Sequence, residues 1–349
     1  MRSVGFTGFA PKQEQWGLHL RPNSLCFVDK NVLTATFITR EIGATLAQRN
    51  QTGESLPLKL HGIFLDADLG KVLDTKEWSI TRPRGGVVAA DDGRFVVLAP
   101  GRVALHSPSL ELVKDFKLSS EQESHLWNFY TSPTGKSILV EYHYPEASFQ
   151  WIDVGSLQPQ LTWKDSLPGV SISDDELAFP RDTYVKSKGT VHQVFIRQRN
   201  GSEQAVCRAI VGKGDPCGVP EFISNEALAL LTPHGLTIVP KTGGDSLLKV
   251  TFRDDEWLVR PLYPSADGKR FAVEVWTHRG GSALLDIGSN DLLQRIVVYD
   301  LPSRRAICIL EARELKIRKV SGVALSRDGS QLAILEDGIV EVYRVTSTM

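Results

Sequence analysis

The sequence predicts an all-β protein built from seven repeats of four antiparallel strands. Short apolar runs rich in Val, Ile, Leu and Phe are bounded by Gly, Pro, Asn and Asp, as strands separated by turns are. One strand–turn–strand pattern recurs along the whole 349-residue chain. Long amphipathic helical patterns are nearly absent, and the best helical candidate, Ser119 to Asn128, is short and lies between repeats.

The first half of each repeat is a pair of strands joined by a polar turn. The clearest copies are "LYPSADGKRFAVEVW" from Leu262 and "VALSRDGSQLAIL" from Val323, which share the turn Ser-x-Asp-Gly. Asp and Gly suit hairpin turns because both tolerate positive φ. The other five copies begin at Leu25, Val87, Phe129, Val170 and Glu221.

The second half of the repeat is another strand, polar turn and strand. Examples are "VALHSPSLELVKDF" from Val103 and "IVVYDLPSRRAICIL" from Ile296. The repeats follow one another at roughly 40 to 60 residues, close to the four-strand period of a propeller blade. If the strands of a blade are named a to d, the a–b and c–d turns share one face, and the b–c loops and d–a connections share the other.

The repeated "D-G-[KRS]-x-φ-φ-φ" and "V-Y-D-L" elements, in which φ is apolar, resemble those of the WD40/YVTN-type seven-bladed β-propeller superfamily. The resemblance covers almost the whole chain, although the Gly-His, Trp-Asp and YVTN signatures are missing. It implies a seven-bladed β-propeller of four-stranded antiparallel blades as one domain over residues 1–349, and it carries over no catalytic motif. The expected blades cover residues 21–80, 85–119, 127–165, 169–209, 219–253, 260–312 and 320–346.

The last repeat runs out after Val345, before it can form a fourth strand. Spare chain before the first repeat includes "EQWGLHL", residues 14–20. A strand from this segment would cover the open edge of the last blade. We therefore expect the N-terminal strand 14–20 to complete that blade and close the ring.

The composition is that of a soluble globular protein, with 42% hydrophobic residues, 23% charged residues and a formal net charge of −1. The balanced charge argues against nucleic acid as a partner, and the basic run "RELKIRK" from Arg313 reads as a solvated edge. Apolar runs stay too short for a membrane span. The first twenty residues lack the apolar core of a signal peptide, so we expect a cytoplasmic protein unless an export signal has been removed.

Four cysteines are too few for a disulfide framework at this length. Cys26 and Cys308 lie in apolar runs and are expected to be buried thiols. Cys207 and Cys217 stand at the two ends of the Gly-rich stretch "CRAIVGKGDPCG". They could close a disulfide in an exported protein or remain free thiols, and the sequence leaves both alternatives open.

The aspartates of the repeated turns could also be read as metal ligands. Asp91, Asp92, Asp267 and Asp328 are the candidates, but a calcium loop needs several ligands within about twelve residues. "SADGKRFAVEVW" offers one Asp and then a strand, so we expect no metal site. The sequence also lacks a P-loop, a Gly-x-Ser-x-Gly elbow and Cys-x-x-Cys or His-x-x-x-His pairs, and we expect no cofactor.

Candidate binding residues come from the b–c loops and d–a connections, the face on which propellers are expected to bind ligands. These loops vary in length, as functional loops do, and the longest runs from Trp276 to Arg295. The simpler alternatives are a tolerated insertion, aromatics packed between blades, and a surface ion pair of Arg181 with Asp182. The candidates are Arg84, Trp127, His143, Arg181, Trp257, Arg260, His278 and Arg279.

Two classes of function remain open. The preferred hypothesis is a monomeric, non-catalytic module that binds a protein or small-molecule partner through the b–c and d–a loop face. The alternative is a hydrolase that resembles bacterial propeller lactonases and needs inward-facing polar residues from at least three blades at the channel mouth. A subunit of a redox enzyme ranks last, because the sequence offers no cofactor anchor.

Overall fold

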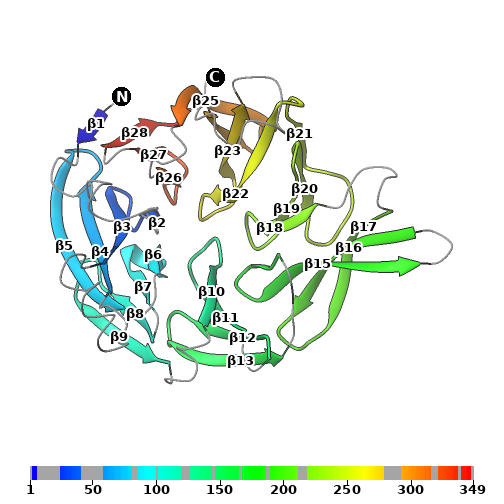
Figure 1. The fold of residues 1–349 in the computed structure, drawn as a ribbon, viewed down its shortest axis with the longest axis horizontal. Coiled ribbons are helices and arrows are strands. Elements are labelled where there is room, and N and C mark those ends of the chain that lie inside the picture. Colours follow the sequence, from blue (N-terminus) through cyan, green and yellow to red (C-terminus); the bar gives the residue numbers. More distant parts are fainter. Residues whose placement is uncertain are drawn as a thin grey trace, which may run out of the picture. The chain divides into compact units, whose positions relative to one another are not determined.

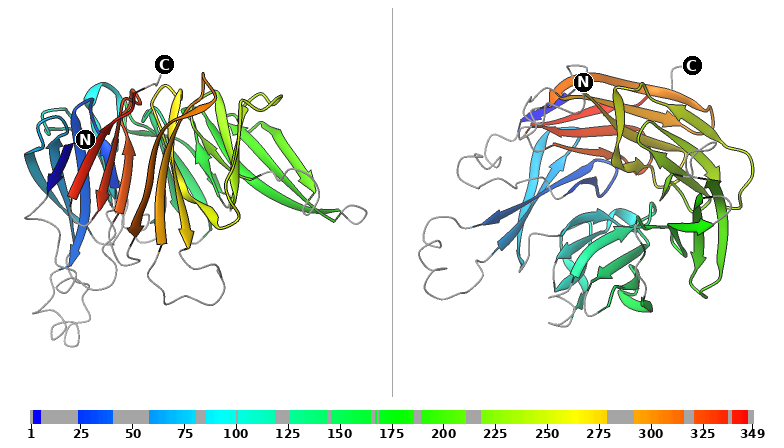
Figure 2. Two further views of the ribbon diagram at one scale, coloured as in Figure 1. Left: turned by 90° about the horizontal axis from the view of Figure 1, so that it is seen from above. Right: turned by 45° about the vertical axis from the view of Figure 1, so that its right-hand side comes forward.

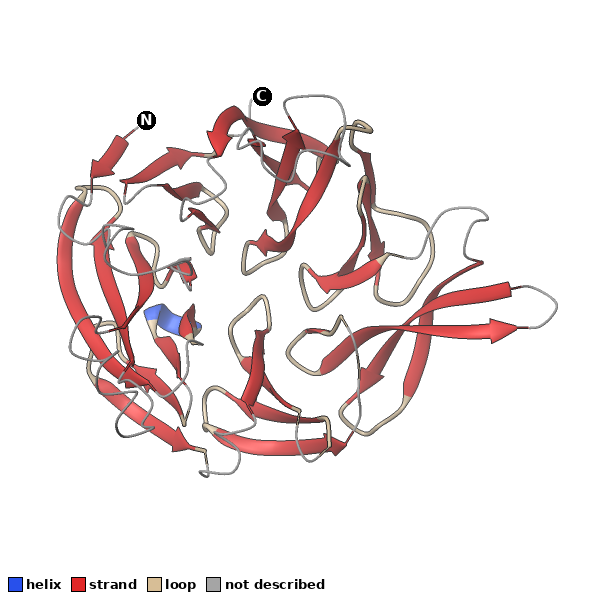
Figure 3. Ribbon diagram, in the orientation of Figure 1, coloured by secondary structure: helices blue, strands red, loops and turns tan. Residues whose placement is uncertain are grey.

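The computed structural model contains seven four-stranded sheets, and Figures 1 and 3 show a chain made almost entirely of strands. The strand pairs described below run antiparallel, so the fold is the seven-bladed β-propeller that the sequence predicted. Among the described residues there is no α-helix long and apolar enough to cross a bilayer. The structure describes residues 2–5, 24–40, 58–80, 85–99, 101–118, 126–143, 146–164, 167, 169–185, 189–210, 218–278, 292–315, 321–336 and 339–346.

The chain divides into two compact units, of which the first comprises residues 1–129, 140–160 and 318–344. Blade 1 consists of β2 (Ser24–Phe27), β3 (Val32–Arg40), β4 (Leu58–Asp66) and β5 (Lys71–Ile80). Blade 2 consists of β6 (Gly86–Ala89), β7 (Phe95–Ala99), β8 (Arg102–His106) and β9 (Leu112–Lys117), with a 3-10 turn at Asp91–Gly93. Blade 7 consists of β26 (Ser321–Leu325), β27 (Gln331–Glu336), β28 (Ile339–Arg344) and β1 (Arg2–Gly5).

The second unit comprises residues 130–139, 161–317 and 345–349. Blade 4 consists of β14 (Ser171–Ile172), β15 (Glu176–Val185), β16 (Gly189–Gln198) and β17 (Glu203–Ile210). Blade 5 consists of β18 (Val219–Phe222), β19 (Ala227–Thr232), β20 (Gly235–Pro240) and β21 (Leu248–Thr251). Blade 6 consists of β22 (Glu256–Pro264), β23 (Arg270–His278), β24 (Leu292–Asp300) and β25 (Arg305–Leu315). Blade 3 has residues in both units and consists of β10 (Leu126–Thr131), β11 (Ser137–Tyr142), β12 (Ser148–Asp153) and β13 (Gln158–Lys164).

An N-terminal strand completes the last blade, as the sequence predicted. This strand is β1, which pairs antiparallel with β28 from Arg2 opposite Val342 to Gly5 opposite Ile339. The prediction that residues 14–20 form the fourth strand of blade 7 was therefore wrong. Residues 14–20 lie outside the described residues. Backbone groups alone make such a pairing, so a short segment without an apolar run can supply it.

The a–b turns of blades 6 and 7 are held together by their Ser-x-Asp-Gly elements. The Asp267 carboxylate accepts hydrogen bonds from Ser265 Oγ at 2.8 Å and from the Lys269 amide at 3.0 Å. Gly268 has a φ of +66°, and a Cβ atom there would lie 2.2 Å from Ser224 Cβ in the a–b turn of blade 5. Glycine is therefore needed both for the turn and for the approach of the neighbouring blade. These contacts confirm the turn-forming role predicted for this aspartate.

Five of the c–d turns share a second geometry, in which a residue at or near the end of the turn has a left-handed backbone. Gly70 and Gly201 fill this position in blades 1 and 4. Non-glycine residues fill it in three other blades: Leu110 with a φ of +66°, Leu157 with +49° and Arg304 with +56°. A positive φ is costly for a residue with a Cβ atom, so these three turns carry local strain.

A β-bulge follows the c–d turn in four blades. The outer strand has one extra residue there, which lies opposite no residue of the neighbouring strand. Bulges on edge strands increase the local twist and oppose pairing with another chain. The extra residues are Leu73, Val113, Val206 and Ile307.

Candidate functional site

A network of polar side chains joins the a–b turns of blades 3, 4 and 5 within the second unit. Asp174, in the a–b turn of blade 4, accepts hydrogen bonds from Thr134 of blade 3 and from Asn225 of blade 5. Its backbone carbonyl accepts from Ser137 Oγ at 2.8 Å and from the Arg199 guanidinium. The Asp174 carboxylate and carbonyl therefore bond side chains of both neighbouring blades, so this turn connects blade 4 to blades 3 and 5.

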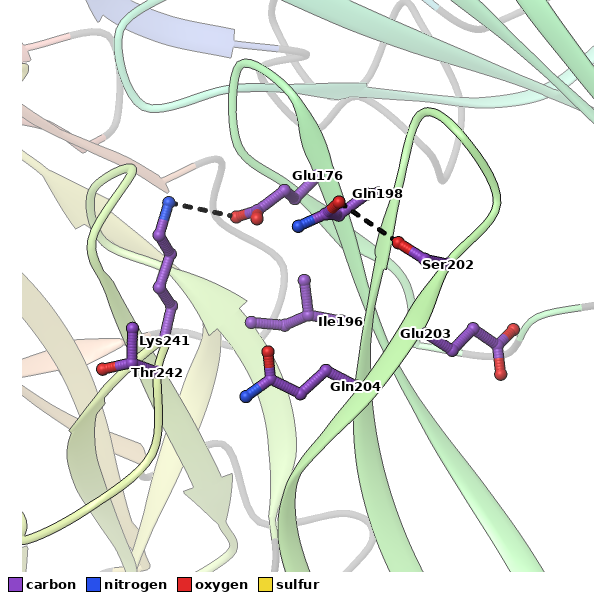
Figure 4. Close-up of a pocket in the computed structure, with 8 residues that line it drawn as sticks. All are labelled: Glu176, Ile196, Gln198, Ser202, Glu203, Gln204, Lys241 and Thr242. Carbon is purple, nitrogen blue, oxygen red and sulfur yellow. Dashed lines mark hydrogen bonds and ion pairs between the residues drawn. The ribbon is translucent and has the colours of Figure 1, made fainter.

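A polar pocket of about 260 Å³ lies beside this network, between blades 4 and 5 (Figure 4). Glu176 begins β15 and Gln198 ends β16, whereas Lys241 belongs to the c–d turn of blade 5. These positions place the pocket on the face of the a–b and c–d turns, opposite the face on which the sequence predicted ligand binding. The lining residues are Glu176, Ile196, Gln198, Ser202, Glu203, Gln204, Lys241 and Thr242.

The charges at the rim of the pocket are paired. Lys241 Nζ lies 3.4 Å from the carboxylates of both Glu176 and Glu226. Burial lowers the pKa of Lys241, but the two carboxylates raise it by more, so its pKa lies above its usual value and the ammonium stays charged. The Glu203 side chain points away from the other lining residues in Figure 4. Its carboxylate accepts a hydrogen bond from Arg197 Nη2 at 2.6 Å.

The chemistry of this pocket is that of recognition by hydrogen bonds. Gln198 accepts a hydrogen bond from Ser202 Oγ at 3.1 Å, and Gln204 lies on the opposite side of the Ile196 side chain (Figure 4). Amides, hydroxyls and a paired ammonium can hold a polar group, but the lining contains no nucleophile beside a base. No motif marks these residues in the sequence. The only signal is the length of the turn that follows Pro240, the longest c–d turn among the described blades.

Some of the residues predicted as binding candidates cannot be placed. Arg84 and Arg279 lie outside the described residues, and nothing is described of the side chains of Trp127, Arg260 and His278. The backbone shows, however, that Trp127 belongs to β10, that Arg260 belongs to β22 and that His278 ends β23.

Three of the predicted residues lie in strands rather than in the d–a connections in which they were predicted: Trp127, Trp257 and Arg260. The turn at Asp254 and Asp255 ends the connection early, so β22 begins at Glu256 and Trp257 is a half-buried strand residue. Two consecutive aspartates suit a turn, and the apolar run after them is long enough to start the strand. The predicted placement of Trp127, Trp257 and Arg260 in loops was therefore wrong.

His143 lies where it was predicted, directly after β11 in a b–c loop. Its side chain is exposed, and Nε2 lies 2.8 Å from the Glu141 carboxylate. This contact with Glu141 fixes the orientation of the ring.

Arg181 lies in β15, and its guanidinium pairs with the Glu203 carboxylate at 3.1 Å. The same guanidinium stacks over the Phe179 and Phe195 rings at 5.2 and 4.8 Å from their centroids. The predicted ion pair with Asp182 was wrong, because that carboxylate pairs with His192 on the other face of the hairpin. Adjacent strand residues point to opposite faces, so neighbours in sequence rarely pair there.

A charged cluster missed by the sequence reasoning lies at the start of β22. The Glu256 carboxylate is buried and accepts hydrogen bonds from Arg253 Nη2 at 2.9 Å and Arg295 Nη2 at 2.8 Å. Burial raises the pKa of Glu256, but the Arg253 amide and the two guanidinium groups lower it by more, so its pKa lies below its usual value. His234 Nδ1 lies 2.8 Å from the Glu256 carbonyl oxygen and ties blade 5 to this cluster.

Comparison with solved structures identifies the fold. The chain is similar to Kluyveromyces lactis Hsv2, with a TM-score of 0.53, 11% identity, and 93% of each chain covered. It is also similar to the Neurospora crassa Pan2 WD40 domain, with a TM-score of 0.51, 12% identity, and 99% and 95% of the two chains covered. A chain of a mitotic checkpoint complex matches with a TM-score of 0.53, 14% identity, and coverages of 99% and 95%. The chain has the WD40-type propeller fold.

Sequence comparison adds nothing to this assignment: no protein-family profile matches the chain, and no curated protein is detectably similar to it. Within the part of this WD40-type propeller that the structure describes, no group of three or more His, Cys, Asp or Glu side chains is placed to hold a metal ion.

Proposed function

We propose that this WD40-type propeller is a non-catalytic binding module and that a protein partner docks on its b–c and d–a loop face. The observation that carries the proposal is the β15–β16 hairpin, which is the b–c connection of blade 4. Both strands have ten residues, whereas the a strand β14 has two. Figures 1 and 2 show this hairpin projecting beyond the other strands of the second unit.

Exposed side chains on the hairpin support this proposal. Tyr184 is 75% exposed, although tyrosine is a large and partly apolar residue that most often finds a partner surface. Exposed aromatic residues beside charged ones are typical of the contact surfaces of proteins. Arg181, one of the predicted binding residues, lies on the same strand and keeps 43% of its side chain exposed.

A cluster of ion pairs and hydrogen bonds around Glu256 also supports a binding surface on the b–c and d–a loop face. The Glu256 cluster joins the b–c turn of blade 5 to the start and the c strand of blade 6 through ion pairs and hydrogen bonds. A docking surface on fixed elements loses less conformational entropy on binding than one on free loops. No observation among the described residues favours the hydrolase alternative.

The test replaces residues 279–291, between β23 and β24, by a short Gly-Ser linker and compares this variant with the wild type. A partner is first identified by cross-linking in the native cells, and its affinity for both proteins is then measured. The matched control is Lys241→Ala with Thr242→Ala, on the opposite face. We expect the linker variant to lose affinity and the control to keep it. The reverse result, with affinity lost only in the control, would contradict the proposal.

A further inference from the structure

The distal half of β15 has an edge that no described strand covers. β15 pairs with β16 over its full length, from Glu176 opposite Gln198 to Val185 opposite Gly189. On its other edge, β14 pairs only with Leu177 and Ala178. The edge of β15 from Arg181 to Val185 is therefore without a strand partner among the described residues.

The side chains along this edge are open to solvent on both faces of the hairpin. Arg181, Asp182, Thr183 and Tyr184 are four consecutive exposed residues. A strand with one covered face would alternate between buried and exposed residues, so neither face of β15 is covered here. Figure 2 agrees, because the ends of both strands lie away from the other strands of the second unit.

The direction of the backbone groups can be assigned from one contact near the start of β15. The Glu176 carbonyl accepts a hydrogen bond from the Ser173 amide at 2.9 Å, on the β14 side of the strand. Directions alternate along a strand, so residues 178, 180, 182 and 184 also point their backbone groups toward this edge. Pro180 fits this assignment, because proline has no N–H and is found where no ladder hydrogen bond is needed. The amides and carbonyls of Asp182 and Tyr184 thus point outward.

Charged residues often protect an edge strand, and the two charged residues of this edge already have side-chain contacts within blade 4. The Arg181 guanidinium is held by Glu203, and the Asp182 carboxylate is held by His192. An added strand therefore meets an Arg181 guanidinium that already has a charged partner and an Asp182 carboxylate that already has a side-chain contact. Thr183 and Tyr184, next along the edge, have high β-propensity and favour cross-strand contacts.

We propose that the edge from Arg181 to Val185 receives an extended segment of a partner protein by strand addition. The backbone of the segment forms hydrogen bonds with the outward amides and carbonyls of Asp182 and Tyr184. An aromatic or β-branched side chain of the segment packs on the Tyr184 ring. This inference rests on the proposed function and names the chemistry of the partner. The segment that binds this edge is an extended polypeptide, and it needs no charged side chain at its centre.

The probe is the peptide acetyl-Lys-Thr-Val-Tyr-Val-Thr-Lys-amide, which favours an extended backbone. The control peptide has the same sequence with N-methyl groups on Val, Tyr and Val, so that its central amides cannot donate. Full-length protein is titrated with each peptide while amide hydrogen exchange is followed by NMR. The matched variants are Tyr184→Pro, which removes one outward amide, and Tyr184→Ala, which keeps that amide and removes the ring.

In the free protein, we expect fast exchange of the Asp182 and Tyr184 amides and slow exchange of the Thr183 amide, which points toward β16. The probe should slow exchange at Asp182 and Tyr184, and the N-methylated peptide should leave it unchanged. Tyr184→Pro should weaken binding of the probe by at least about tenfold, and Tyr184→Ala by about threefold.

Several results would overturn the inference. In the free protein, the Asp182 and Tyr184 amides could exchange as slowly as the Thr183 amide, which would mean that they do not point outward. The probe could also bind Tyr184→Pro and the wild type with the same affinity, which would mean that the Tyr184 amide does not bond it. Self-association that Tyr184→Pro abolishes would identify a second copy of the chain as the occupant instead. If Tyr184→Pro binds the native partner normally and the 279–291 linker variant does not, this inference fails and the proposed function stands.

Discussion

Asp174 of blade 4 and Asn225 of blade 5 hydrogen-bond each other twice. Asn225 Nδ2 donates to the Asp174 carboxylate at 2.8 Å, and the Asp174 amide donates to Asn225 Oδ1 at 3.1 Å. Both residues occupy a–b turns, and Thr134 adds the corresponding turn of blade 3. Turns that were predicted only to reverse the chain therefore also connect successive blades.

Asp174→Ala should lower the free energy of unfolding by about 2 kcal/mol, because Thr134 and Asn225 lose a charged acceptor in a half-buried place. The matched control is Asp175→Ala, whose side chain is 77% exposed and lies 3.2 Å from the Arg199 guanidinium. That change should cost less than about 0.5 kcal/mol. Urea denaturation of both variants checks the difference, and equal effects would show that the connection between turns contributes no stability.

Arg304→Gly should stabilise the protein by about 1 kcal/mol, because the glycine relieves a positive φ of 56° at an exposed position. Leu157→Gly removes a similar strain, at a φ of 49°, but its side chain is fully buried. The loss of that burial should outweigh the relief and destabilise the protein by about 2 kcal/mol. Thermal or urea unfolding measures both. Destabilisation by Arg304→Gly would mean that the turn is not strained.

The strands and the number of blades could be predicted because each is encoded locally. An apolar run followed by Asp-Gly is enough to locate a hairpin such as the one around Asp267, and the repeat of that pattern sets the fold. The strand that completes blade 7 could not be located, because β1 is a four-residue segment without an apolar run, and its pairing with β28 uses backbone groups that nearly every residue carries.

The candidate site was harder to predict than the fold, because it is assembled from distant segments. The pocket joins Glu176, the end of β16 and the Lys241 turn, and none of these carries a motif. The open edge of β15 depends on the shortness of β14, which is a property of pairing and not of composition. Arg181 was predicted as a candidate, but its partner Glu203 could be found only in the folded hairpin.

Glu256→Gln should lower the stability at pH 7 by about 2 kcal/mol, because the Arg253 and Arg295 guanidinium groups lose their charged acceptor. It should also change the pH dependence. The folded-state pKa of Glu256 lies below its usual value of 4.5, so its stabilising contribution is present above that pH and is lost as the pH falls further. Urea midpoints from pH 7 to pH 3 should therefore fall less for the variant than for the wild type. Parallel curves would contradict this role of the carboxylate.

Glu274→Gln should change the pH dependence of stability in the opposite direction to Glu256→Gln, because the folded-state pKa of Glu274 is raised and not lowered. Burial raises the pKa of Glu274, and hydrogen bonds from Trp276, Gln294 and Tyr263 do not fully offset it. An acid with a raised folded-state pKa opposes folding once the pH rises above its unfolded value of about 4.5. A neutral glutamine removes that opposition, so the variant should lose less stability than the wild type between pH 4 and pH 7. A steeper loss in the variant would show that the charged carboxylate is the favoured form.

Cys207 takes part in a disulfide, whereas Cys26 and Cys308 are free thiols. The remaining cysteine of the sequence, Cys217, lies outside the described residues and is the partner that we predict. Thiol titration of the denatured protein should find two thiols before reduction and four after it. Because the bridge would close a loop of about ten residues, Cys207→Ser should cost about 3 kcal/mol of stability, whereas Cys308→Ser, at a free thiol, should cost less than about 1 kcal/mol. Four reactive thiols without reductant would contradict the pairing and would favour the free-thiol alternative.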